Sequence, residues 1–239
     1  MAYYEIAFYS GIKTLYGLCV LLMAFGFLLR NTKKGKLSFV ILCLVAAGFH
    51  TLFYFFLLLS IIPHTNPRRL IKPMVFLVIV LTILMRISGS AASYLQFFFD
   101  AFDNEHINLY TTSIVHFGFY LAIIPHMISL YITYKARKYN DSIGLSNSKT
   151  DMLYYTSLFS LMFIPFYAVS LTFMRLISTF SMAVIAGTSS VMDYTRESRS
   201  KYLMLSLLVI LFFLSQKFLL SSAESNFWKD SVVPFFNVF

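Results

Sequence analysis

Long runs of apolar residues, separated by short polar segments, dominate the pattern of the chain. A transmembrane helix needs about 20 consecutive apolar residues, and several runs approach that length. We predict membrane-spanning helices over the ranges 12–29, 37–62, 73–98, 109–134, 152–173, 176–192 and 202–220. The pattern therefore predicts an all-α, polytopic helical membrane protein with about six to seven transmembrane segments, forming one membrane domain over residues 1–239.

A long polar segment and a proline each add a prediction to this pattern of spans and loops. The segment 135–151 is the longest polar stretch between two apolar runs, and we predict a loop there. Pro165 lies inside the apolar run 152–173, where it predicts a kink in the helix.

The apolar run 37–62 differs from the others in what it contains and in what surrounds it. It has no Asp, Glu, Lys or Arg, and His50, halfway along, is its only strongly polar side chain. An imidazole at membrane depth is costly unless it has a partner or a function. Basic residues flank the run on both sides: Arg30, Lys33, Lys34 and Lys36 before it, and Arg68, Arg69 and Lys72 after it.

These two basic flanks leave two topologies open for the run 37–62. If the run crosses the membrane once, the better orientation puts ten loop Lys and Arg inside the cell and the four of segment 30–36 outside. If the run enters the membrane, turns near His50 and returns, all fourteen loop Lys and Arg are cytoplasmic. The excess of Lys and Arg in cytoplasmic loops favours this re-entrant or broken helix. Length does not decide, because one continuous helix would be about 39 Å long, which tilting accommodates.

Composition supports a membrane protein and argues against several classes of function. Hydrophobic residues make up 59% of the 239 residues and charged residues 12%, well below the quarter that is typical of soluble domains. The net charge of +9 comes largely from short loops, so it indicates cytoplasmic loops and not a nucleic-acid partner. Cys19 and Cys43 both lie in apolar runs, which favours packing roles over a disulfide or a metal site. The sequence has no HExxH, Gly-rich phosphate loop or GxSxG motif, and we expect neither a metal nor a cofactor.

Five cationic or imidazole side chains are expected in the outer half of the membrane when the run 37–62 is re-entrant. They are Lys13, His50, Arg86, His116 and Arg175. Arginine binds phosphate through forked hydrogen bonds, and a low dielectric strengthens each contact. A histidine nearby can act as a general base. The set predicts a site for a lipid-linked diphosphate in which His50 and Arg175 are catalytic, while Arg86, Lys13 and His116 bind the substrate.

Structural roles are also open for these residues. Arg86 can pair with Asp100 or reach the membrane interface, and Arg175 can anchor a helix end. His50 can cap or brace a break in a helix through one hydrogen bond. We expect a structural role for His126, which follows a proline.

Short motifs along the chain resemble the EpsG-like, Wzy-type polysaccharide polymerases. The run from Gly11 to Leu18, the basic segment after it and the pair Phe49-His50 are similar to parts of the second half of that family. There the family has an Arg-led helix start, a basic turn and an Ala-x-x-Phe-His signature. Lys13 stands where the family tends to have Arg. The positive charge is kept, but the paired N–H donors of a guanidinium group are lost. Met174-Arg175 resembles a later Arg-containing helix start, and the segment 226–235 resembles the closing segment.

The resemblance implies a multi-pass glycosyltransferase of the bacterial inner membrane with a GT-C-like helical fold. Such a protein joins polyprenyl-diphosphate-linked oligosaccharide repeat units at the outer face, during the synthesis of O-antigen, capsule or exopolysaccharide. Its partners would be this substrate, membrane lipids, and a chain-length regulator or another assembly protein. Two other functions stay open: a transporter or flippase of lipid-linked sugars, and a truncated, non-catalytic membrane subunit of the same pathway.

Overall fold

The structure is a computed structural model that describes residues 2–63, 67–87, 119–144, 148–167, 173, 175–191 and 199–221, and side chains over 13–63, 67–84, 123–144, 148–167, 173, 176–191 and 201–213. Every element in these ranges is helical, as the apolar pattern predicts. The α-helices are α1 (Ala2–Leu28), α2 (Lys33–Phe49), α3 (Ile71–Ile87), α6 (Phe119–Ser142), α7 (Ser148–Phe159), α8 (Ile164–Tyr167), α9 (Arg175–Val191) and α10 (Arg199–Ser221). The 3-10 helices are η1 (Thr51–Ile61), η2 (Pro67–Leu70) and η4 (Ser160–Phe163).

Within the described part of the chain, none of the helices meets the combined length and hydropathy expected of a membrane crossing. The predicted spans and the single membrane domain stay predictions.

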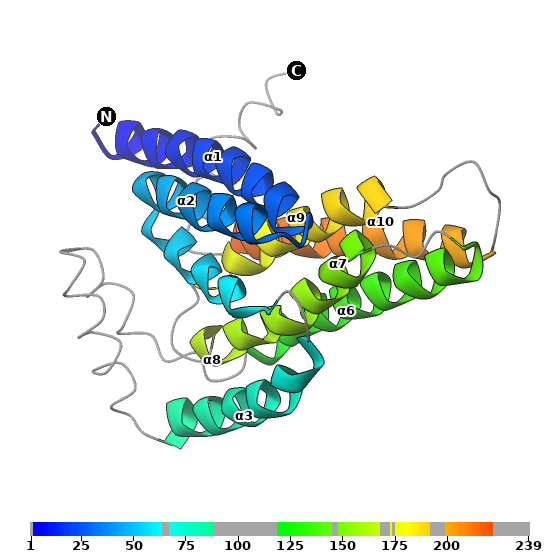
Figure 1. The fold of residues 1–239 in the computed structure, drawn as a ribbon. Coiled ribbons are helices and arrows are strands. Elements are labelled where there is room, and N and C mark those ends of the chain that lie inside the picture. The colour runs from blue at the N-terminus through cyan, green and yellow to red at the C-terminus, as the bar shows by residue number, and fades with distance from the viewer. Residues whose placement is uncertain are drawn as a thin grey trace.

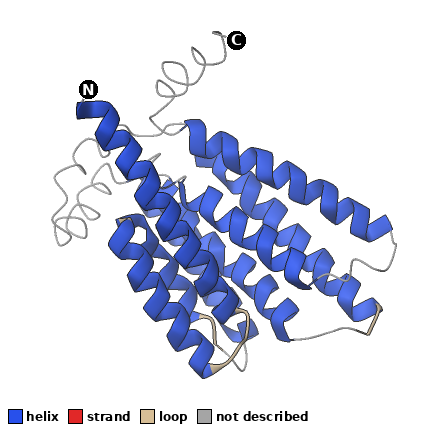
Figure 2. Cartoon of the chain, turned by 90° about the horizontal axis from the view of Figure 1, so that it is seen from above, coloured by secondary structure: helices blue, strands red, loops and turns tan. Residues whose placement is uncertain are grey.

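The helices pack as a bundle in which most axes follow one common direction (Figures 1 and 2). α1 and α2 form an antiparallel hairpin at one edge, α3 lies at the opposite edge, and α6, α7, α9 and α10 lie between them (Figure 1). The turn of the hairpin is short. Asn31 takes a left-handed φ of 50°, and the Thr32 hydroxyl then caps α2 by accepting a 3.0 Å hydrogen bond from the Gly35 amide.

The helix expected over 37–62 is broken at His50. α2 ends at Phe49, His50 is extended with φ −152° and ψ 121°, and η1 begins at Thr51. The chain then reverses and brings Ile62 back to the start of α2, where the side-chain nitrogen of Lys36 donates a 3.2 Å hydrogen bond to the carbonyl oxygen of Ile62. The two ends of the run therefore meet, which confirms the broken helix and excludes one continuous helix.

Burial explains why the second arm of this run is a 3-10 helix. Such helices have three residues per turn and seldom exceed one turn, but η1 has 11 residues. Phe53, Phe56, Leu59 and Ile62 recur every third residue, and each is at most 3% exposed. One face of a 3-10 helix can bury all four, and each such side chain contributes about 1.5–3 kcal/mol when fully buried.

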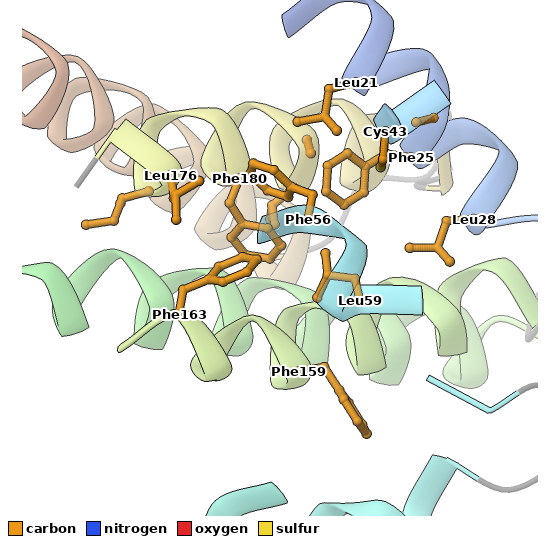
Figure 3. Packing of buried hydrophobic residues seen from close by; sticks show 14 of the residues in the cluster. Leu21, Phe25, Leu28, Cys43, Phe56, Leu59, Phe159, Phe163, Leu176 and Phe180 are labelled. Carbon is orange, nitrogen blue, oxygen red and sulfur yellow. The ribbon is translucent and has the colours of Figure 1, made fainter. Parts of the chain in front are cut away.

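The ring of Phe56 lies at the centre of the core (Figure 3). It makes edge contacts with Phe25 of α1 and Phe163 of η4, at centroid distances of 5.7 and 5.3 Å. Phe25 also approaches Phe180 of α9 at 6.3 Å. The second arm of the broken helix is thus packed inside the bundle, among elements that are distant in sequence.

The loop predicted over 135–151 is wrong for most of its length. α6 continues through the polar segment to Ser142, and α7 begins at Ser148. Lys, Ala and Arg at 135–138 are good helix formers, so α6 extends beyond the end of the apolar run. An ion pair of 2.6 Å between Arg137 and Asp151 also joins the two helices.

The regular α-helix is interrupted just before Pro165, where the sequence predicts a kink. α7 gives way to η4 over Ser160–Phe163, just before the proline. Pro165 offers no N–H to the carbonyl of Leu161, and its ring crowds that carbonyl, so the regular α-helical ladder cannot continue there.

Candidate active site

The basic segments gather at one end of the bundle, called here the basic end. It comprises the α1–α2 turn, η2, the ends of α6 and α9, and the starts of α7 and α10. Asn140 of α6 donates hydrogen bonds to the Thr150 hydroxyl of α7 at 3.1 Å and to the Val191 carbonyl of α9 at 2.8 Å. The guanidinium of Arg68 in η2 donates a 3.2 Å hydrogen bond to the hydroxyl of Tyr155 in α7.

Packing adds the remaining elements to the basic end. Leu29 at the end of α1 and Leu153 of α7 both lie against Gly187 of α9. Met204, near the start of α10, packs with Ala136 and Tyr139 of α6. A single crossing by 37–62 would have separated the segment 30–36 from the segment 67–72, but the structure has both at the same end.

Two cations of the basic end have shifted pKa values. The hydrogen bond to Tyr155 raises the pKa of Arg68, whereas burial lowers the pKa of Lys36. The bond from Lys36 to the Ile62 carbonyl offsets part of the cost of removing the ammonium group from water.

The other end of the bundle is called here the His50 end. α2 starts at the basic end and reaches His50 after 17 helical residues, a rise of about 26 Å. Lys13 lies on α1 at a similar height, because Tyr16, one turn further along α1, contacts the ring of Phe49 at 6.3 Å. The backbone of Lys13 and that of His50 therefore share this end, as the sequence predicts, and the Lys13 side chain is exposed.

His50 caps the helix that follows it. Its ring nitrogen Nδ1 accepts a 3.3 Å hydrogen bond from the backbone N–H of Leu52, while the ring contacts Phe53 at 5.7 Å. A neutral imidazole has one N–H, so when Nδ1 accepts, the proton is on Nε2. In this geometry His50 can donate a hydrogen bond through Nε2, and it cannot take a proton there.

Two predicted arginines are placed by their helices alone. Arg86 is in the last turn of α3, which begins at the basic end beside η2, and Arg175 is the first residue of α9, which ends at the basic end. Both backbone positions are at the His50 end of their helices (Figure 1). Their side chains, and all of His116, lie outside the described residues. The convergence of the five side chains stays a prediction.

A cluster of three rings connects the His50-capped helix to the segment before α9. Phe55 of η1 contacts Phe166 of α8 at 4.7 Å and Phe173 at 5.0 Å, and Phe166 contacts Phe173 at 5.7 Å. Phe173 is buried and lies two residues before Arg175. These ring contacts thus keep Phe173, just before α9, next to η1, the helix that His50 caps.

The hydrogen-bond partners of His126 could not be predicted from the sequence. It is 1% exposed, and both ring nitrogens have partners. Nδ1 lies 2.9 Å from the Ser160 hydroxyl and Nε2 lies 2.7 Å from the Tyr167 hydroxyl. A signal was present in the sequence: His126, Ser129, Thr133 and Asn140 recur at helical spacing along α6, whose first part, up to Tyr134, is mostly apolar.

The described residues supply hydrogen-bond donors and positive charge at the His50 end, through His50 and Lys13. Within the part of the chain that the structure describes, no group of three His, Cys, Asp or Glu could hold a metal ion. Such donors suit an anionic or hydroxyl-rich substrate.

Comparison with known protein families identifies a family match for the chain. The model of the EpsG family matches residues 1–236. No curated protein and no solved structure matches the chain.

Proposed function

Because the chain belongs to the EpsG family of Wzy-type polymerase-like proteins, we propose that it joins lipid-diphosphate-linked oligosaccharide repeat units at the outer face of the bacterial inner membrane. This is glycosyl transfer in polysaccharide biosynthesis. The match extends over nearly the whole chain, in agreement with the resemblance found in short motifs.

The segregation of charge between the two ends of the bundle carries the proposal. The basic end contains Lys and Arg from every basic segment whose side chains are described. The His50 end has Lys13 and His50, with the backbones of Arg86 and Arg175 at the same ends of their helices. The positive-inside rule then makes the basic end cytoplasmic, and the His50 end faces outward.

Exposed apolar side chains between the two ends support a membrane location. Phe76 on α3 is 70% exposed, Phe213 on α10 is 66% exposed and Met23 on α1 is 61% exposed. Other large apolar residues on the same helices are also exposed. Soluble proteins rarely present contiguous apolar surface of this kind, whereas lipid tails would cover it.

In the proposed reaction, the bond between the anomeric carbon of the growing glycan and the diphosphate breaks. A hydroxyl oxygen of the next lipid-linked unit forms the new glycosidic bond and loses its proton to an oxygen of the departing diphosphate, and the polyprenyl diphosphate leaves with the electron pair. Arg175, with Arg86, Lys13 and His116, would neutralise the negative charge that develops on the diphosphate. His50, with its proton on Nε2, would orient a substrate oxygen as a hydrogen-bond donor.

A complementation experiment tests the proposal. In a strain from which the gene is deleted, Arg175→Ala should leave single lipid-linked units without polymer, and Arg175→Lys should restore polymer poorly because Lys lacks the fork. Arg69→Ala, at the basic end, is the matched control and should support normal polymer. Normal polymer with Arg175→Ala would refute the role of this residue, and failure of the wild-type chain to restore polymer would refute the proposal.

The same strain separates the two alternative functions. A flippase defect would leave the lipid-linked units on the inner face, where glycosidases added to intact spheroplasts cannot reach them. A polymerase defect leaves them accessible on the outer face. A non-catalytic subunit would fail to restore polymer in a host that lacks the rest of the pathway's polymerase.

A further inference from the structure

His126 lies inside the bundle and contacts two aromatic rings. Its ring is nearly parallel to that of Tyr167 on α8 and to that of Phe180 on α9, with interplanar angles of 26° and 23°. Both centroid distances are 5.6 Å. One side chain of α6 therefore contacts both α8 and α9.

The bond that Ser160 makes to the backbone assigns donor and acceptor roles to the hydrogen bonds of His126. When the Ser160 hydroxyl donates its proton to the Ser157 carbonyl, 2.8 Å away, it accepts at 2.9 Å from Nδ1–H of His126. Nε2 then has a lone pair, and the Tyr167 hydroxyl donates to it at 2.7 Å. In this arrangement every polar group in the chain of bonds has a partner.

The two rings that His126 contacts come before and after the segment that leads to Arg175 along the chain. Tyr167 ends α8, and Phe180 lies five residues after Arg175, in the second turn of α9. His126 thus ties together the elements before and after that segment.

We propose that His126 is a positioning residue for Arg175, which holds the first turns of α9 in place through Tyr167 and Phe180. This inference rests on the proposed function, in which Arg175 binds the diphosphate. Apolar packing alone could fill the same volume, whereas the directional bonds of His126 favour one orientation of α8 relative to α6.

The sharpest test removes one hydroxyl. Tyr167→Phe keeps the ring and deletes the donor to Nε2, while Tyr155→Phe makes the same chemical change at the basic end. We would measure polymer formation against the concentration of lipid-linked repeat unit, with the full chain reconstituted in phospholipid vesicles. Hydrogen–deuterium exchange of the amides of residues 176–184 would be followed in the same samples.

We expect Tyr167→Phe to lower kcat by about tenfold or more, with KM changed less than about threefold, since misplacing a catalytic group by about 1 Å can cost up to 10²-fold. Exchange at 176–184 should become faster in Tyr167→Phe and stay as in the wild type in Tyr155→Phe. Unchanged exchange in Tyr167→Phe, or a kcat within about twofold of the wild type, would overturn the inference. If the wild-type chain made no polymer, the proposed function would fail, and the exchange measurement would still decide whether Tyr167 holds the start of α9.

Discussion

The ammonium group of Lys36 donates a hydrogen bond to the carbonyl oxygen of Ile62, 3.2 Å away, across the two ends of one apolar run. This contact requires the chain to turn back within the run, and the turn is at His50. The basic residues before and after the run therefore belong to one face of the protein. Burial lowers the pKa of Lys36, and its bond to the carbonyl compensates for lost hydration.

We expect Lys36→Met to weaken the closure of this hairpin. The variant keeps the apolar stem and leaves the buried Ile62 carbonyl without its donor, which costs about 1–2 kcal/mol. The melting temperature of the purified protein should fall by about 3–6 °C. Lys34→Met is the control, because Lys34 is exposed on the same helix, and its melting temperature should stay near that of the wild type. Equal melting temperatures for the two variants would show that the bond contributes nothing.

The charge pattern favoured a break in the run 37–62 over a single crossing, but the apolar pattern did not predict the conformation of its second arm. Basic residues on both flanks indicated that the run returns to the same face. The sequence does not predict the 3-10 helix, because nearly every residue of Thr51–Ile61 is apolar. The buried residues at every third position therefore cannot be told apart from the exposed ones between them. Only the packing of Phe53, Phe56 and Leu59 against the bundle selects that period.

The two roles of His50 can be separated by substitution. Asn caps helices well, because its side-chain oxygen accepts from a backbone N–H of the first turn, whereas Ala cannot cap. We expect His50→Ala to lose about 1 kcal/mol of stability and all polymer formation. His50→Asn should keep wild-type stability and still lose most of the polymer, since it lacks the imidazole Nε2–H. Wild-type polymer yield in His50→Asn would reduce His50 to a helix cap.

The measurement for His50 needs both readouts on the same preparation. Thermal unfolding reports the cap, and polymer length on gels reports the chemistry. A parallel loss of both in His50→Asn would mean that the amide does not reproduce the cap, and Leu52 exchange rates would reveal this directly.

Removal of the buried hydroxyl should change the free energy of unfolding differently at Ser160 and at Ser157. Ser160→Ala leaves Nδ1–H of His126 without an acceptor inside the core, and we expect a loss of about 1–3 kcal/mol. Ser157→Ala removes a buried hydroxyl that has no partner among the described residues, so stability should stay the same or rise slightly. Unfolding midpoints of the two purified variants give the comparison. Equal losses would indicate that volume, and not the His126 bond, determines the effect.

His126 shows how much of a residue's role can be predicted from the sequence alone. A structural role was predicted from its position after Pro125, but its partners Ser160 and Tyr167 are 34 and 41 residues away along the chain. Contacts of that range depend on how α7 breaks before Pro165, which places both partners beside α6. Local pattern predicts the break and does not predict which residues it brings together.

The last prediction concerns Gly17, where α1 approaches the first residues of η1. A Cβ at this position would lie 2.9 Å from Cδ2 of Phe53, closer still to Cε2, and 3.2 Å from the Cβ of Phe49. Phe53 is 3% exposed, so its ring has little room to move. We expect Gly17→Ala to cost about 1–3 kcal/mol by overpacking and to lower polymer yield, because Phe53 also contacts the ring of His50.

Gly26, on the same helix, provides the matched control for Gly17. A Cβ there meets nothing within 4 Å, so Gly26→Ala should stabilise α1 by about 0.5–1 kcal/mol through the helix propensity of Ala. Unfolding midpoints and polymer yields of the two variants test the pair. If Gly17→Ala were as stable and as active as Gly26→Ala, then the close approach of α1 to Phe53 would not be what holds the His50 turn in place.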